Sequence, residues 1–137
     1  MGQLMTDETG ITVTDMEAGL EHLRRGTTRY VDAMLVVSEP YYKSLEVAGR
    51  TAELALELGI KRVYAVANKA RDARDVEAVR EYFARHDVPL LATVPFDESV
   101  MEADRRGIAP MDVAQKTPLQ AEVEKIAQEV FLGGNGL

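Results

Sequence analysis

The chain has 137 residues, a net charge of −7 and no cysteine. This length suits one domain with a buried core, and the lack of cysteine excludes disulfides and thiolate metal ligands within the chain. The acidic balance disfavours a nucleic-acid partner, because phosphate backbones are bound by clustered Lys and Arg side chains. No apolar run approaches the length of a membrane span, and no signal-peptide pattern is present. The sequence therefore predicts a cytoplasmic protein without a membrane partner.

The sequence predicts four β-strands after an N-terminal segment without regular structure. Residues 1–10 are expected to be disordered or a linker, and strands are expected over 11–14, 33–37, 62–67 and 88–94. The continuous apolar runs 33–37 and 88–94 suit buried central strands, whereas the alternating run 11–14 suits a half-exposed edge strand.

Helical patterns follow the last three strands, over 45–58, 74–85, 98–106 and 118–131. Ser44, Asp97 and Thr117 are the expected N-caps of the first, third and fourth helices, and Thr117 begins a capping-box sequence. Residues 133–137 are expected to be a frayed tail. The alternation predicts an α/β fold: one three-layer domain over 1–137, with a parallel sheet of about four strands between flanking helices.

Each predicted strand ends in polar or aromatic residues. The four strand ends carry Asp15, then Ser38-Glu39, then Asn68-Lys69, and finally Pro95-Phe96-Asp97. In a parallel sheet these ends lie on one edge, and the crevice outside that edge is where α/β folds bind ligands. The sequence therefore predicts a ligand site along this edge.

The segment ITVTDMEAGLEHLRRGTT, residues 11–28, carries the first of these ends. A short apolar strand that ends in Asp15, with Gly19 four residues later, is typical of nucleotide hydrolases. The carboxylate can accept hydrogen bonds from waters on Mg²⁺, and the glycine lets backbone N–H groups approach a terminal phosphate. The alternative is that Asp15 caps a helix that begins near Glu17. No GxxxxGK[ST] phosphate loop occurs in the chain.

Asn68 offers a donor and an acceptor in one fork, which complements N6 and N7 of adenine. Guanine-specific switch proteins extend this residue to Asn-Lys-x-Asp, in which the Asp accepts from the guanine N1 and N2 donors. Here the segment reads Asn68-Lys69-Ala70-Arg71, and Asp72 comes one position late. The pattern favours adenine over guanine; the alternative is that Asn68 only ends a strand and starts a turn.

The run DMEAGLEHLRRGT resembles the Walker B and switch II segment of the CooC-type ATPases, which mature carbon monoxide dehydrogenase. These ATPases lie within the deviant-Walker-A class that also contains MinD and ParA. The resemblance extends through VDAMLVVSEPYYKSLEVAGRTAELALELGI, VYAVANK and VPFDESVMEADRRG, so it covers residues 11–110. It implies a MinD-like P-loop NTPase fold that is truncated and lacks the N-terminal phosphate loop.

The resemblance also implies roles for individual residues. Asp15 and Gly19 match the catalytic Walker B and switch II positions, with Asp15 supporting Mg²⁺ through water. The family's switch signature is matched by Glu17, Glu21 and His22. The base-binding positions are matched by Asn68, Lys69, Pro95, Phe96 and Asp97. The implied cofactor is ATP or ADP with Mg²⁺, bound weakly or not at all by this chain.

The implied function is that of the C-terminal portion of a protein that uses ATP-driven dimerisation to load a metal, nickel, into a client metalloenzyme. Without a phosphate loop, the chain alone is expected to be inactive. It would act as a homodimer or with a separate N-terminal P-loop half. Two alternative functions are a non-catalytic interaction or dimerisation module and, ranked lower, a receiver-like phosphoacceptor domain.

Overall fold

The computed structural model of the chain describes residues 3–6, 10–16, 31–113 and 116–132. Its main sheet contains β3 (Ala33–Ser38), β4 (Arg62–Ala70) and β5 (Leu90–Pro95), all parallel and in the order β3-β4-β5. The pairing of β3 with β4 is continuous from Ala33 opposite Arg62 to Ser38 opposite Ala67. The predicted parallel α/β sheet is confirmed.

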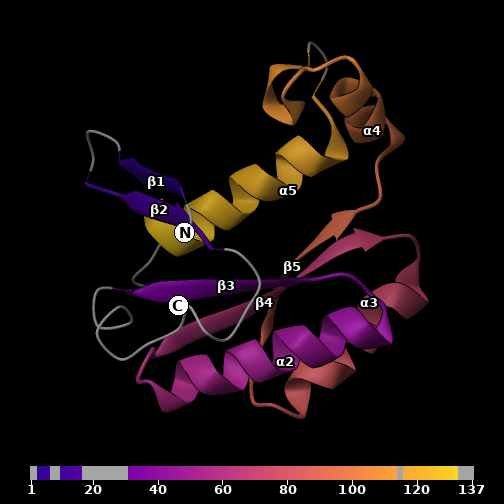
Figure 1. Cartoon of the computed structure of the whole chain (residues 1–137). Helices are drawn as coiled ribbons and strands as arrows, with labels where there is room; N and C mark the ends of the chain where they lie inside the picture. The colour runs from indigo at the N-terminus through magenta and orange to yellow at the C-terminus, as the bar shows by residue number, and fades with distance from the viewer. Residues whose placement is uncertain (1–2, 7–9, 17–30, 114–115, 133–137) are drawn as a thin grey trace.

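Helices cover both faces of this sheet (Figure 1). The first face carries α2 (Tyr42–Glu57) and α3 (Ala73–Ala84), and the second carries α5 (Pro118–Ala127), which continues into a π-helical turn over Gln128–Leu132. Between β5 and α5 lie the short helix α4 (Glu98–Arg105) and a 3₁₀ turn over Pro110–Asp112. The three layers agree with the prediction. Among the described helices, none is both long enough and apolar enough to cross a membrane.

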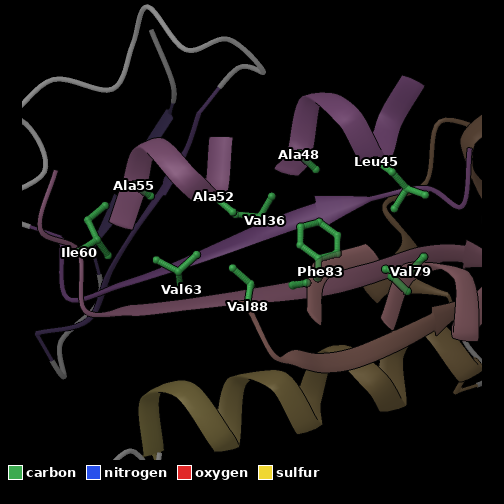
Figure 2. Close-up of a cluster of buried hydrophobic side chains, with 12 residues drawn as sticks. Val36, Leu45, Ala48, Ala52, Ala55, Ile60, Val63, Val79, Phe83 and Val88 are labelled. Carbon is green, nitrogen blue, oxygen red and sulfur yellow. The ribbon is translucent and has the colours of Figure 1, made fainter. Parts of the chain in front are cut away.

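The core lies between the sheet and the α2–α3 layer (Figure 2). The apolar side of α2 recurs every three or four residues, as one face of a helix requires. The four residues of that face are buried: Leu45, Ala48, Ala52 and Ala55. Val79 and Phe83 of α3 are fully buried beside them. Small residues on α2 thus let the bulky Phe83 fill the space between the two helices and the sheet.

The helix ends follow local sequence with one exception. Thr117 and Gln120 form the predicted reciprocal capping box at α5, and Asp97 caps α4 by accepting from the Ser99 N–H. Ser44 is not an N-cap, because α2 begins two residues earlier with Tyr41 in the cap position. The Ser44 hydroxyl instead accepts from the Glu39 N–H at 3.0 Å, so it joins the helix to the end of β3.

The N-terminal strand is placed differently from the prediction. Thr12–Asp15 (β2), which overlaps the strand predicted over 11–14, pairs antiparallel with Gln3–Thr6 (β1) in a separate two-stranded sheet. β1 lies within residues 1–10, which were predicted to be disordered or a linker. The main sheet therefore has three strands among the described residues, not four. A hairpin partner a few residues away is reached at little loop-closure cost, so it wins over a distant parallel partner.

The two apolar runs predicted to be central strands are the outer strands of the described sheet, with β4 between them. Apolar side chains indicate that the two faces of a strand are buried, but they do not indicate whether both of its backbone edges are hydrogen-bonded to neighbouring strands. Val36 is buried against the α2 layer, but Val37 points to the other face and is 57% exposed. The exposed Val37 side chain shows that this face of β3 is only partly covered by other elements.

Candidate functional site

The carboxyl end of β4 contains an irregularity at Asn68-Lys69. The pairing with β5 runs to Ala67, is interrupted at these two residues, and resumes where Ala70 lies opposite Pro95. Lys69 has φ of +57°, in the left-handed region that is unfavourable for a residue with a Cβ. Bulges of this kind re-aim side chains and are frequent beside functional sites. The irregularity takes Asn68 out of the regular β4–β5 pairing.

The loop after β5 is fixed against this irregularity. The Phe96 N–H donates to the Ala70 carbonyl at 2.9 Å, which extends the β4–β5 contact beyond the last strand pair. Three of the predicted base-binding residues, Asn68, Lys69 and Phe96, therefore lie at adjoining strand ends. Asn68 is half-buried, and none of the side-chain hydrogen bonds found among the described residues uses its amide. Within the described part of the chain, the amide is thus available to a ligand.

Asp97 presents a carboxylate with two different environments. Its Oδ1 accepts from the backbone N–H and the hydroxyl of Ser99. Its Oδ2 is buried and has no hydrogen-bond partner within the described part of the chain. A buried acceptor without a donor is destabilising by about 1–3 kcal/mol. Such an atom is satisfied by a water or by a donor from a ligand.

Arg71 joins the two loops by a contact that the sequence did not predict. Its guanidinium carbon lies 4.1 Å from the centre of the Phe96 ring. This distance is well within the range of a cation–π interaction. The only sequence signal for it is that Arg71 stands at the fourth position of the Asn-Lys-x-x segment, where guanine-specific proteins carry Asp.

Asp72 does not replace that missing carboxylate. It is the N-cap of α3, and its side chain accepts from the Asp75 N–H at 3.0 Å. Asp75 in turn accepts from the Arg71 N–H at 2.8 Å. The two carboxylates next to the segment thus stabilise the start of α3.

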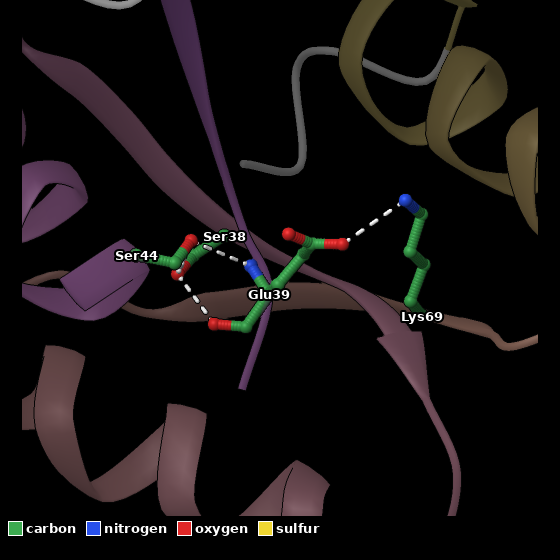
Figure 3. Close-up of polar contacts among 4 residues, drawn as sticks. All are labelled: Ser38, Glu39, Ser44 and Lys69. Atoms are coloured by element: carbon green, nitrogen blue, oxygen red, sulfur yellow. Dashed lines mark hydrogen bonds and ion pairs between the residues drawn. The ribbon is translucent and has the colours of Figure 1, made fainter. Parts of the chain in front are cut away.

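A polar network joins the end of β3 to this site (Figure 3). Ser38 is 1% exposed, and its hydroxyl donates to the Glu39 carbonyl and contacts the Ser44 hydroxyl at 3.2 Å. The Glu39 carboxylate pairs with the Lys69 ammonium at 3.1 Å. Both side chains of the ion pair are substantially exposed, so it contributes little to stability. The network holds the ends of β3 and β4 together.

The remaining predicted site residues are not assembled at this edge. Asp15 ends the exposed strand β2, outside the parallel sheet, so the expected row of four strand ends contains three. In Figure 1 the β1–β2 hairpin lies away from the carboxyl ends of β3, β4 and β5. The switch residues Glu17, Gly19, Glu21 and His22 lie outside the described residues.

The described residues do not form a magnesium site by themselves. They contain no group of three His, Asp or Glu side chains that could hold a metal ion. Asp15 is exposed on its hairpin, and a single carboxylate is not a sufficient set of ligands for Mg²⁺ without a phosphate.

Several known proteins are similar to this chain in sequence. The carbon monoxide dehydrogenase accessory protein CooC of Rhodospirillum rubrum is 36% identical over 111 residues, which are 81% of this chain and 41% of that protein. Two uncharacterized ATP-binding proteins of Methanocaldococcus jannaschii are 34% and 38% identical over 87% and 85% of this chain, and over 47% and 44% of their own lengths. No family model matches.

A solved structure supports the fold. The chain superposes on a ParA family ATPase from Chlorobium tepidum TLS with a TM-score of 0.60 at 23% identity, over 75% of this chain and 43% of that one. At this identity the similarity concerns the fold alone. The chain spans less than half the length of the curated relatives described above.

Proposed function

We propose that this chain, a relative of the CooC-type proteins within the MinD/ParA-like P-loop class, binds the base of an adenine nucleotide at the ends of β4 and β5. The carrying observation is the interrupted β4–β5 pairing at Asn68, whose side-chain amide makes none of the hydrogen bonds found among the described residues, next to Phe96, which is bonded to Ala70. Curated relatives bear the description ATP-binding, which is consistent with this ligand.

The chemistry of the three strand-end groups suits adenine. The Asn68 amide can accept from the adenine N6 amino group and donate to N7. Phe96 and Pro95 supply apolar surface beside the polar edge, and Asp97 holds a buried acceptor that has no donor among the described residues. A base that brings an amino group and an aromatic face complements this set better than a ligand that is only anionic, because the chain carries a net charge of −7.

The complete activity belongs to a longer assembly. Because the chain spans less than half of its relatives, we propose that ATP turnover needs a phosphate loop from elsewhere, and that this chain alone is inactive. In that assembly Asp15 would support Mg²⁺ through water, beside Gly19 and the switch residues. By its similarity to an accessory protein of carbon monoxide dehydrogenase, the assembly would help to mature a metalloenzyme, with nickel as the cargo.

The open edge of β3 favours a second candidate function, that of an interaction or dimerisation module. Among the described strands, β3 is paired on one side only, and Val37 is 57% exposed on an apolar strand. An unpaired apolar strand is a template for a strand from another chain. The partner would be a separate P-loop half or a second copy of this chain.

The first proposal is tested by recording backbone amide NMR signals of the chain while Mg-ATP is added. Saturable shifts are expected at Asn68, Ala70 and Phe96, and the Asn68→Ala variant should lose them. Gln128→Ala is the matched control, because it removes an exposed side-chain amide at the end of α5, away from Asn68. Unchanged signals in the unsubstituted chain would refute base binding, and robust ATP turnover measured by calorimetry would refute the claim of inactivity.

The interaction module is tested separately by sedimentation velocity. Self-association through β3 predicts a dimer whose dissociation constant rises on Val37→Asp substitution, since a charge would be placed on the uncovered strand. The control is Val47→Asp, at an exposed valine on the outer side of α2. A monomer at all concentrations would leave only the separate P-loop half as a partner for this edge.

A further inference from the structure

Arg71 occupies an unusual position for an arginine in an acidic chain. Its side chain is exposed, and none of the ion pairs found among the described residues includes its guanidinium. The contact it makes is instead with an aromatic ring, at 4.1 Å from the Phe96 centre. A guanidinium over a ring keeps its hydrogen-bond donors free, because the interaction uses the charge and not the N–H groups.

Backbone hydrogen bonds hold both members of this stack. The Arg71 N–H donates to Asp75 Oδ2 at 2.8 Å, and the Phe96 N–H donates to the Ala70 carbonyl at 2.9 Å. The two residues therefore face each other because their main chains are fixed at neighbouring strand ends. A preformed stack loses less conformational entropy when a ligand binds than two mobile side chains would.

We propose that Arg71 is a base-selecting residue of the proposed adenine site, and that its guanidinium over Phe96 is the surface on which the purine stacks. The inference rests on the proposed function, because it concerns the same ligand. Bases stack on arginine planes as they do on aromatic rings. The two functions are divided between neighbours: Asn68 reads the edge of the base, and Arg71 binds its face.

The same residue disfavours guanine. Guanine presents donors at N1 and N2, and these need an acceptor such as the Asp of the Asn-Lys-x-Asp pattern. Arg71, at that position, has only donors. The adjacent Asp72 is occupied by the Asp75 N–H and lies 3.7 Å from the Arg74 guanidinium. No carboxylate of this segment is thus left for guanine, whereas adenine requires none.

The experiment measures dissociation constants of AMP and GMP from NMR titrations, and the ratio of the two cancels the contribution of the shared phosphate. Arg71→Ala should weaken AMP binding about tenfold, the scale of one lost stacking contact. Arg71→Lys should also weaken it, because lysine keeps the charge without the plane. Arg71→Asp restores Asn-Lys-x-Asp and should shift the AMP-to-GMP preference towards GMP about tenfold. Arg80→Ala, which removes an exposed arginine further along α3, away from the strand ends, is the control and should leave both constants unchanged.

The outcomes separate the two proposals. AMP binding that depends on Asn68 but is unchanged in Arg71→Ala would overturn the role of Arg71 and leave the base site intact. Equal losses in Arg71→Ala and Arg80→Ala would show an effect of net charge and would also overturn it. If the unsubstituted chain shows no AMP-dependent shift, the base site itself is refuted, and the role of Arg71 falls with it.

Discussion

Gly49 lies in the middle of α2, where a glycine is intrinsically unfavourable, and we predict that replacing it with alanine nevertheless destabilises the protein. A Cβ at this position would lie 2.7 Å from Cε1 of Tyr82, 3.1 Å from its hydroxyl and 3.3 Å from Nε2 of His86. The glycine therefore permits the close approach of α2 to α3, since Tyr82 and His86 both lie at the end of α3 or just beyond it.

Two opposing terms set the magnitude for Gly49→Ala. The gain in helix propensity is about 0.8–1.0 kcal/mol, whereas overpacking of a closely packed site costs about 1–3 kcal/mol. The ring of Tyr82 cannot rotate away freely, because it contacts Phe83 edge-on at 5.9 Å and the His86 ring at 4.9 Å between centroids. We expect a net loss of up to about 2 kcal/mol in the free energy of unfolding.

Urea denaturation followed by circular dichroism measures this loss, and a double-mutant cycle identifies its cause. In a Tyr82→Ala background the obstructing ring is absent, so Gly49→Ala should stabilise by about 1 kcal/mol, its intrinsic helix preference. The sign of the substitution thus reverses between the two backgrounds. A more stable Gly49→Ala variant of the unsubstituted chain, or additive effects of the two changes, would refute the reasoning.

Three further predictions concern the core, a helix cap and pH. Phe83→Ala removes a fully buried ring and should lower the free energy of unfolding by about 3–5 kcal/mol in urea titrations; a loss comparable to that of an exposed residue would contradict the packing. Thr117→Ala breaks the capping box of α5 and should lower the free energy of unfolding by about 1 kcal/mol. Thr117→Ser keeps the hydroxyl and should retain most of the stability of the unsubstituted chain in thermal melts. The pKa of Tyr82 is raised, first by burial of its hydroxyl and then by the negative charges of its neighbours. Because a raised pKa means that the folded state holds the proton more tightly, stability is complete below the unfolded pKa of Tyr, about 10, and declines as pH rises above it. Tyr82→Phe should flatten that alkaline decline in urea midpoints measured from pH 9 to 11, and an equal decline in both proteins would exclude Tyr82 as the cause.

Much of the candidate site could be read from local sequence. The strand ends at Asn68 and Pro95 were predicted from apolar runs that stop at polar residues, and the structure places them at adjoining ends of β4 and β5. Their role in base binding stays a prediction. The contact of Arg71 with Phe96 could not be predicted from the sequence, because it joins residues 25 positions apart and leaves no periodic signal.

The sequence alone determined the local features: the buried face of α2, the capping box at Thr117 and the parallel βα alternation. These depend on residues a few positions apart, whose side chains and backbone interact within a single helix or turn. Only the tertiary structure decided which strands lie at the edges and where Asp15 lies. Strand order depends on long-range backbone pairing, which side-chain apolarity does not encode, and the nearby β1 outcompetes a distant partner for β2 because a short hairpin loop closes at lower entropic cost.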